Sequence, residues 1–298
     1  MPPDIQRSTA SSMLDQVLTW YADKTRLGNS SYVIVDAAQN KALWLKLAAK
    51  FASLPILEAS EAEMIPHLVA LPAPDQIDQT TRKLLDRAHS ADLSVLCSTM
   101  AHAPLRDHLR AHTAVRLSGG IEMLLAFWDP AILGTLIGHT GDDTLHVKGP
   151  VLLPEQKTAF LHPISAWCYR DREENVHCLE GSADPVAHEP SPLVLDQAQE
   201  DALVEAGVPD QLLYHLETNR PTLFDPDLPH HRRYRFVRAV LPSARQLGLT
   251  GMRDLTNFVA ICLIYRQRIQ TDPEILQLLD QVQKKKLSFD EALAQMPE

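Results

Sequence analysis

The segment 182–192, SADPVAHEPSP, separates two parts of this 298-residue sequence that differ in pattern. It contains three prolines, shows no apolar periodicity and is rich in turn-forming residues. Upstream of it, short apolar runs typical of strands alternate with helical patterns, whereas every downstream pattern is helical. We therefore predict an N-terminal α/β (α+β) lobe with a mixed sheet and hairpins, followed by an all-α C-terminal lobe.

This division predicts four segments. They are a helical extension over residues 1–30, an α/β domain over 31–181, a proline-rich linker over 182–192 and a helical domain over 193–298. The extension is assigned from a helix over 8–24, where apolar side chains recur at helical spacing.

Strand and helix patterns alternate through the first half of the α/β domain. Strands are expected at 31–35, 54–57, 67–71 and 93–98, and helices at 40–51, 76–88 and 102–112. Such alternation suggests a partly parallel sheet covered by helices.

Two hairpins are expected in the second half of this domain. One pairs 113–117 with 121–128 around two adjacent glycines, and the other pairs 164–170 with 176–179 around a charged loop. Between them, Asp129 fits a helix N-cap followed by Pro130 at the first helical position, and a further helix is expected over 154–161.

The helical lobe divides at its capping and breaking residues. Helices are expected over 196–206, which ends at Gly207, and then over 210–219, 230–247, 252–268 and 274–286. Ser288 and Glu291 form a capping box for the last helix.

Composition excludes several classes of function. With 28 Lys and Arg against 38 Asp and Glu, the net charge of −10 gives no general attraction to nucleic acid or anionic membrane. No run reaches the roughly 18 apolar residues of a membrane span. Four cysteines fit a reducing compartment, and the N-terminus lacks the pattern of a secretory signal, so a cytoplasmic protein is expected.

Motifs for catalysis are missing from the sequence. It contains no Gly-x-Ser-x-Gly elbow, no phosphate-binding Gly-x-x-x-x-Gly-Lys loop and no Gly-x-Gly-x-x-Gly fingerprint. Asp36 ends a predicted strand, a position common for active carboxylates, but a cap is the preferred interpretation. We predict no catalytic residue and no cofactor.

Histidine and cysteine pairs offer two possible metal sites. His108 and His112 share one helical face, yet a third ligand is missing nearby, which favours an exposed amphipathic helix. In the second hairpin, pairing of residues 170 and 176 places Cys168 opposite Cys178, where the two can bind metal or be oxidised.

The second set keeps one alternative open. A metal-dependent hydrolase would use His162, His177 and the two hairpin cysteines. Because no Cys-x-x-Cys knuckle is present and cytosolic thiols are normally reduced, we favour two half-buried reduced cysteines and no metal.

A basic run over residues 230–238 interleaves cations with aromatic side chains. At helical spacing its apolar residues form a core stripe, and its arginines form a basic face. The arginines are Arg232, Arg233, Arg235 and Arg238. A solvated face is the favoured interpretation given the net acidity of the chain. Docking of an acidic protein partner is the second interpretation, and an RNA-binding regulator is the less favoured alternative.

The ordered segments of the first lobe resemble a known family. These segments are YVIVDAAQ at 32–39, PHLVAL at 66–71, LSVL at 93–96, LAFWDPAIL at 125–133 and PEQK at 154–157. The series, including Asp36, Trp128, Asp129 and Pro130, resembles the DUF4123 domain of type VI secretion adaptor proteins over roughly 32–180. Those four residues are expected to be structural.

The resemblance implies a non-enzymatic adaptor in the bacterial cytoplasm. Its partners would be a cognate type VI effector and a VgrG or PAAR spike protein, without nucleic acid or membrane insertion. We expect it to grip an apolar effector segment in a cleft between the lobes, with the helical lobe supplying a groove and the arginine face.

Overall fold

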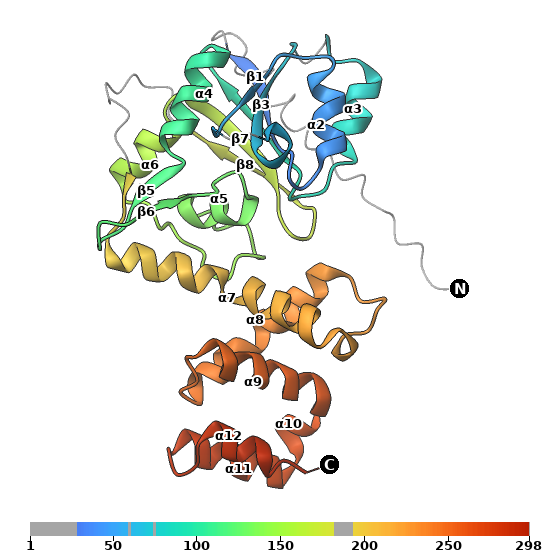
Figure 1. The fold of residues 1–298 in the computed structure, drawn as a ribbon, viewed down its shortest axis with the longest axis vertical. Coiled ribbons are helices and arrows are strands. Elements are labelled where there is room, and N and C mark those ends of the chain that lie inside the picture. Colours follow the sequence, from blue (N-terminus) through green and yellow to red (C-terminus); the bar gives the residue numbers. More distant parts are fainter. Residues whose placement is uncertain (1–28, 59–60, 74–75, 182–192, 298) are drawn as a thin grey trace. The chain divides into compact units, whose positions relative to one another are not determined.

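The computed structural model describes residues 29–58, 61–73, 76–181 and 193–297. Two compact units divide the chain, Met1–Leu203 and Val204–Glu298. The helix predicted over 8–24 and the linker predicted over 182–192 lie outside the described residues. The α/β class followed by a helical region is confirmed (Figure 1).

The division between the units falls later than the sequence suggests. We predicted that the helical domain starts at residue 193, but the short strand β9 (Leu193–Val194) pairs with the first unit. Gln199 also donates a hydrogen bond from Nε2 to the carbonyl oxygen of Val151 at 2.7 Å. The chain therefore returns to the α/β unit before it enters the helical one.

A six-stranded sheet forms the centre of the α/β unit, in the order β2-β3-β1-β4-β7-β8. Its strands are β1 (Ser30–Asp36), β2 (Ser53–Pro55), β3 (Pro66–Leu71), β4 (Leu93–Ser98), β7 (Ile164–Arg170) and β8 (Val176–Glu180). Each pairing in it is antiparallel, so the expectation of a partly parallel main sheet is wrong. Alternation of strands and helices in the sequence predicts where the elements lie. Whether two strands are parallel or antiparallel depends on the end of the sheet at which the chain begins the second strand, which the alternation does not specify.

Helices cover both faces of this sheet (Figure 1). They are α2 (Lys41–Ala48), α3 (Gln79–Asp86), α4 (His102–Ala111), α5 (Pro130–Ile137) and α6 (Pro154–Leu161), with a 3₁₀ turn η2 (Ala62–Met64). Val33 and Val35 of β1 pack with α2 and α3, whereas Tyr32 and Ile34 pack with α4, α5 and α6. Burial on both faces explains why β1 is a continuous apolar run.

A second sheet of three strands has the order β6-β5-β9. Its hairpin joins β5 (Ala114–Arg116) to β6 (Glu122–Leu124) and confirms the turn predicted at the adjacent glycines. Among the described strands, the parallel pairing lies in this second sheet, between β5 and β9. The register of the other hairpin is also confirmed, since Arg170 pairs with Val176.

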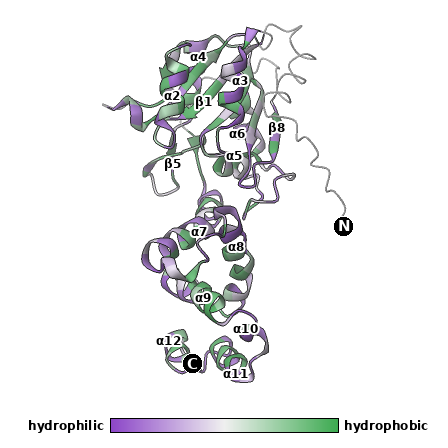
Figure 2. Ribbon diagram, turned by 90° about the vertical axis from the view of Figure 1, so that its right-hand side faces the viewer, coloured by the Kyte–Doolittle hydropathy of each residue, from purple (hydrophilic) through white to green (hydrophobic). Residues whose placement is uncertain are grey.

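The helical unit has its own apolar core, to which α9 contributes many of the apolar residues visible in Figure 2. Its elements are α7 (Gln197–Asn219), which begins in the first unit, η4 (Pro221–Leu223), α8 (His230–Gln246), α9 (Met252–Tyr265), α10 (Arg268–Thr271), α11 (Pro273–Gln283) and α12 (Phe289–Ala294). The predicted capping box of Ser288 and Glu291 is present at α12, and Asp272 caps α11. Among the described residues, no helix combines the length and the apolar character needed to cross a bilayer.

Two helix boundaries differ from the sequence prediction. The helices expected on either side of Gly207 form one continuous helix, α7, with Pro209 inside it. Buried Val208 and Leu212 pack into the core of the helical unit, and this burial offsets the cost of the glycine and proline. The helix expected over 252–268 instead ends at Tyr265, because Arg266 has a φ of 50°.

Candidate functional site

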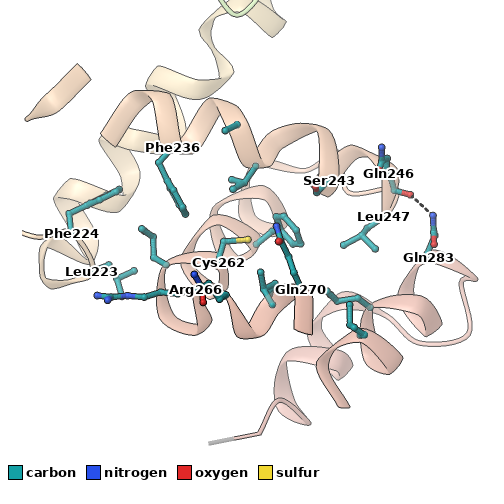
Figure 3. Close-up of a pocket in the computed structure, with 18 of the residues that line it drawn as sticks. Leu223, Phe224, Phe236, Ser243, Gln246, Leu247, Cys262, Arg266, Gln270 and Gln283 are labelled. Carbon is teal, nitrogen blue, oxygen red and sulfur yellow. Dashed lines mark hydrogen bonds between the residues drawn. The ribbon is translucent and has the colours of Figure 1, made fainter. Parts of the chain in front are cut away.

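A cavity of about 740 Å³ opens between α8, α9, α10, α11 and the segment that follows η4. We call it the groove. Phe236 from α8 and Cys262 from α9 point into the space that its lining residues enclose (Figure 3). At one end, Nε2 of Gln283 donates to the carbonyl oxygen of Gln246 at 3.4 Å and links α11 to α8.

The groove has an apolar floor and a mixed rim. Buried Phe258 and Leu279 form part of the floor, and Leu276 on the lining is 43% exposed. The lining also includes charged side chains of both signs, Asp225, Arg266 and Asp280. A site of this kind fits the apolar face of a helix or another amphipathic segment.

The one thiol on the groove lining is poorly suited to nucleophilic chemistry. Burial raises the pKa of Cys262 to about 12, so the side chain is a neutral thiol at physiological pH. The lining residues include no histidine to act as a base beside it. The Cys262 side chain therefore contributes to the groove lining as a neutral thiol.

The structure divides the four arginines of the predicted basic face. Tyr234, Val237 and Leu241 form the expected core stripe. Arg233 does not belong to an open face: its guanidinium contacts the Glu217 carboxylate at 3.0 Å and three backbone carbonyl oxygens. The other three are Arg232 and Arg235, which are exposed, and Arg238, which is half-buried.

The four residues of the family motif lie at one end of the α/β unit. Asp129 caps α5 by accepting from the backbone N–H groups of Ala131 and Ile132, and Pro130 follows at the first helical position. Burial raises the pKa of Asp36, although a hydrogen bond from Trp128 acts in the opposite direction. The motif thus joins the end of β1 to the start of α5.

His108 and His112 form part of the interior of the α/β unit and do not lie on an exposed helix as predicted. The two rings are 4.5 Å apart, and His112 is only 5% exposed. Nε2 of His108 donates to the carbonyl oxygen of Phe160 at 3.0 Å, and Nδ1 of His112 donates to that of His108 at 2.9 Å. Each imidazole therefore has a structural hydrogen bond.

We expect acid to destabilise the α/β unit through His108. Burial, together with His112 and His162, lowers the pKa of His108 from 6.5 to about 4. The unfolded chain takes up this proton near pH 6.5, whereas the folded chain takes it up only near pH 4. Stability should fall across this interval by about 2 kcal/mol. Urea unfolding at pH 7, 5.5 and 4.5 measures the loss.

Two variants isolate the His108 contribution. His108→Gln keeps an N–H donor without an imidazole, so the slope against pH should become shallower. The matched control is His89→Gln, since the side chain of His89 is 84% exposed. An unchanged slope in His108→Gln would assign the acid sensitivity to other groups.

The hairpin cysteines form a disulfide between Cys168 and Cys178, so the prediction of reduced thiols is wrong for this structure. Antiparallel register places the two directly opposite each other, as expected. Because both sulfurs are in the disulfide, the alternative metal set of His162, His177 and two cysteines lacks its thiolate ligands. His177 instead bonds to Asp171, and Nδ1 of His162 is buried with no hydrogen-bond partner among the residues that the structure describes.

The architecture defines an α/β domain joined to a helical unit, and comparison with known families found one match, in the first part. The family model DUF4123, described as a domain of unknown function, matches residues 31–147. No curated protein and no solved structure matches the chain. The match supports this domain family for the α/β unit and ends before α6, β7 and β8.

Sequence reasoning did not identify the residues of the groove. The groove residues come from five segments. In each helix the apolar pattern predicts which side chains face the core, but it does not distinguish fully buried side chains from partly exposed ones that line a groove. Leu276 gives a partial signal of a binding surface. It follows the buried Ile275 of α11, so it is an apolar residue next to the buried face of the helix, and it is exposed.

Proposed function

We propose that this protein is a non-enzymatic adaptor that binds a cognate type VI secretion effector and assists its loading onto a VgrG or PAAR spike protein. The observation that carries the proposal is the apolar groove of the helical unit. The DUF4123 match over residues 31–147 supports the family context in which such an adaptor is expected. The bacterial cytoplasm is the proposed place of action.

An apolar effector segment would gain stability in the groove by losing contact with water. Burial contributes about 25 cal/mol for each Å² of apolar surface removed from solvent. An amphipathic helix would place residues of one face against the floor, near Phe258 and Leu279. Its polar face would meet the charged rim, where both signs are present. Such binding needs no catalytic group.

The test is capture of the effector by groove variants. The chain is co-expressed with the toxin-like protein encoded beside it, and the complex is quantified by affinity capture and light scattering. Leu276→Arg places a charge on the groove lining and should weaken binding at least tenfold, about 1.4 kcal/mol. Because Leu276 is 43% exposed, the helical unit should still fold.

A matched control separates the groove from general surface effects. Ile264→Arg makes the same kind of change on α9 at a residue that is 56% exposed and does not line the groove. It should bind as the unmodified chain does. Equal capture by both variants would contradict the role of the groove, and failure of the unmodified chain to bind any neighbouring effector or spike protein would contradict the adaptor proposal.

A further inference from the structure

Three potential metal-binding side chains converge at the end of the β7–β8 hairpin. Asp142 lies in the loop after α5, Asp171 follows the last residue of β7, and His177 lies on β8. One oxygen of each carboxylate and one ring nitrogen of the histidine all lie within 4.8 Å of one another. Small side-chain movements that shorten these separations to roughly 3.3 Å would let a single tetrahedrally coordinated ion contact all three atoms.

This cluster is buried and carries excess negative charge. Asp142 is 1% exposed and Asp171 is 4% exposed, and the side chain of His177 is 11% exposed. Carboxylates removed from water require compensation by charge as well as by hydrogen bonds. The histidine supplies one hydrogen bond to this pair of carboxylates, whereas a divalent cation would contact both.

Neighbouring residues hold the two carboxylates in place. Asp142 accepts hydrogen bonds from the Thr144 hydroxyl at 2.6 Å and the Tyr169 hydroxyl at 3.2 Å. Asp171 accepts from Nδ2 of Asn175 at 3.0 Å. Metal ligands in proteins are typically oriented by such outer hydrogen bonds.

The imidazoles of His177 and His139 lie side by side, so a shift of protons between their ring nitrogens can leave one nitrogen of His177 free to bind a metal. Nε2 of His177 now donates to Asp171 at 2.9 Å, and Nδ1 of His177 lies 3.1 Å from Nε2 of His139. If the His177 proton moves to Nδ1, Nε2 becomes free to bind an ion and Nδ1–H donates to His139. His139 then carries its own proton on Nδ1, so the rearrangement moves protons within the two rings and adds none.

We propose that Asp142, Asp171 and His177 form a binding site for one divalent transition-metal ion, of which Zn²⁺ is the expected example. One nitrogen and two carboxylate ligands suit Zn²⁺, and Mn²⁺ next, whereas an imidazole disfavours Ca²⁺ and Mg²⁺. The ion would connect the loop after α5 to the β7–β8 hairpin. This site goes beyond the adaptor proposal and does not depend on the groove.

Calorimetric titration of the full-length chain with Zn²⁺ tests the site. The protein is treated with EDTA and dialysed before titration, and bound metal is counted by elemental analysis. We expect one Zn²⁺ at this site, and His177→Gln and Asp142→Asn should each weaken its binding at least tenfold. Absence of Zn²⁺ binding by the unmodified chain at 100 μM, roughly the weakest affinity of interest, would overturn the proposal.

Asp143→Asn is the matched control, because it makes the same change at the next residue, whose side chain is 91% exposed. It should leave Zn²⁺ binding unchanged. If Asp142→Asn does not fold, as judged by circular dichroism, His177→Gln decides. Binding that survives in His177→Gln with the affinity of the unmodified chain would place the ion elsewhere and overturn the assignment.

Discussion

Replacing Trp167 with alanine will lower the free energy of unfolding of the α/β unit by about 3–5 kcal/mol. Trp167 lies on β7 and is fully buried. Its ring centroid is 5.7 Å from that of Phe160 and 5.8 Å from that of Phe127, so removal leaves a large cavity between β7, α6 and the segment before α5. The Ser94 hydroxyl would also lose the hydrogen bond that indole Nε1 donates at 2.9 Å.

Hydrogen exchange can measure this loss at β4 and β7, the strands that carry Ser94 and Trp167. Trp167→Phe is the control, because it keeps most of the aromatic contact and removes the indole donor. It should cost about 1–2 kcal/mol. A loss below 1 kcal/mol in Trp167→Ala would contradict the central packing role given to this side chain.

This prediction also concerns the extent of the domain. The family match ends at residue 147, but β7 pairs with β4 over residues 164–168 and with β8 on its other side. Without β7 and β8, β4 would have an unpaired edge and Phe127 would lose the Trp167 contact. The structural domain therefore continues at least to Glu180, the last residue of β8.

Local patterns in the sequence predicted most elements of the fold. The strand over 93–98 and the helix over 154–161 have the predicted bounds, and the facing cysteines follow from the length of one hairpin loop. These features depend on residues close together in the chain. Strand direction, the continuity of α7 and the pairing of β9 depend on packing between distant segments, which local periodicity does not contain.

The candidate sites show the same limit. Asp142 and Asp171 are separated by 29 positions, and only the fold brings them to His177. Helical spacing predicts one basic surface over the run 230–238, because it does not show that the segment 225–228 lies against one of the arginines. The three carbonyl contacts of Arg233 come from that segment, which precedes α8.

Replacing Arg233 with alanine will therefore destabilise the helical unit by about 2–4 kcal/mol, in contrast to loss of a surface contact. Its guanidinium donates to the carbonyl oxygens of Leu228, Asp225 and Pro226 at 2.7–3.1 Å and pairs with Glu217 at 3.0 Å. It also lies 5.5 Å from the ring centroid of Phe224, a groove residue. Without Arg233, these acceptors lose a charged donor and the segment beside the groove loses its anchor.

Arg232→Ala separates this structural role from partner binding. Arg232 is exposed on the same helix, so its removal should change the free energy of unfolding by less than about 0.5 kcal/mol. Chemical denaturation monitored by exchange of α8 and α9 amides distinguishes the two variants. If Arg233→Ala keeps full stability but loses effector capture, Arg233 acts on the partner directly. If both decline together, the lost capture follows from the altered groove.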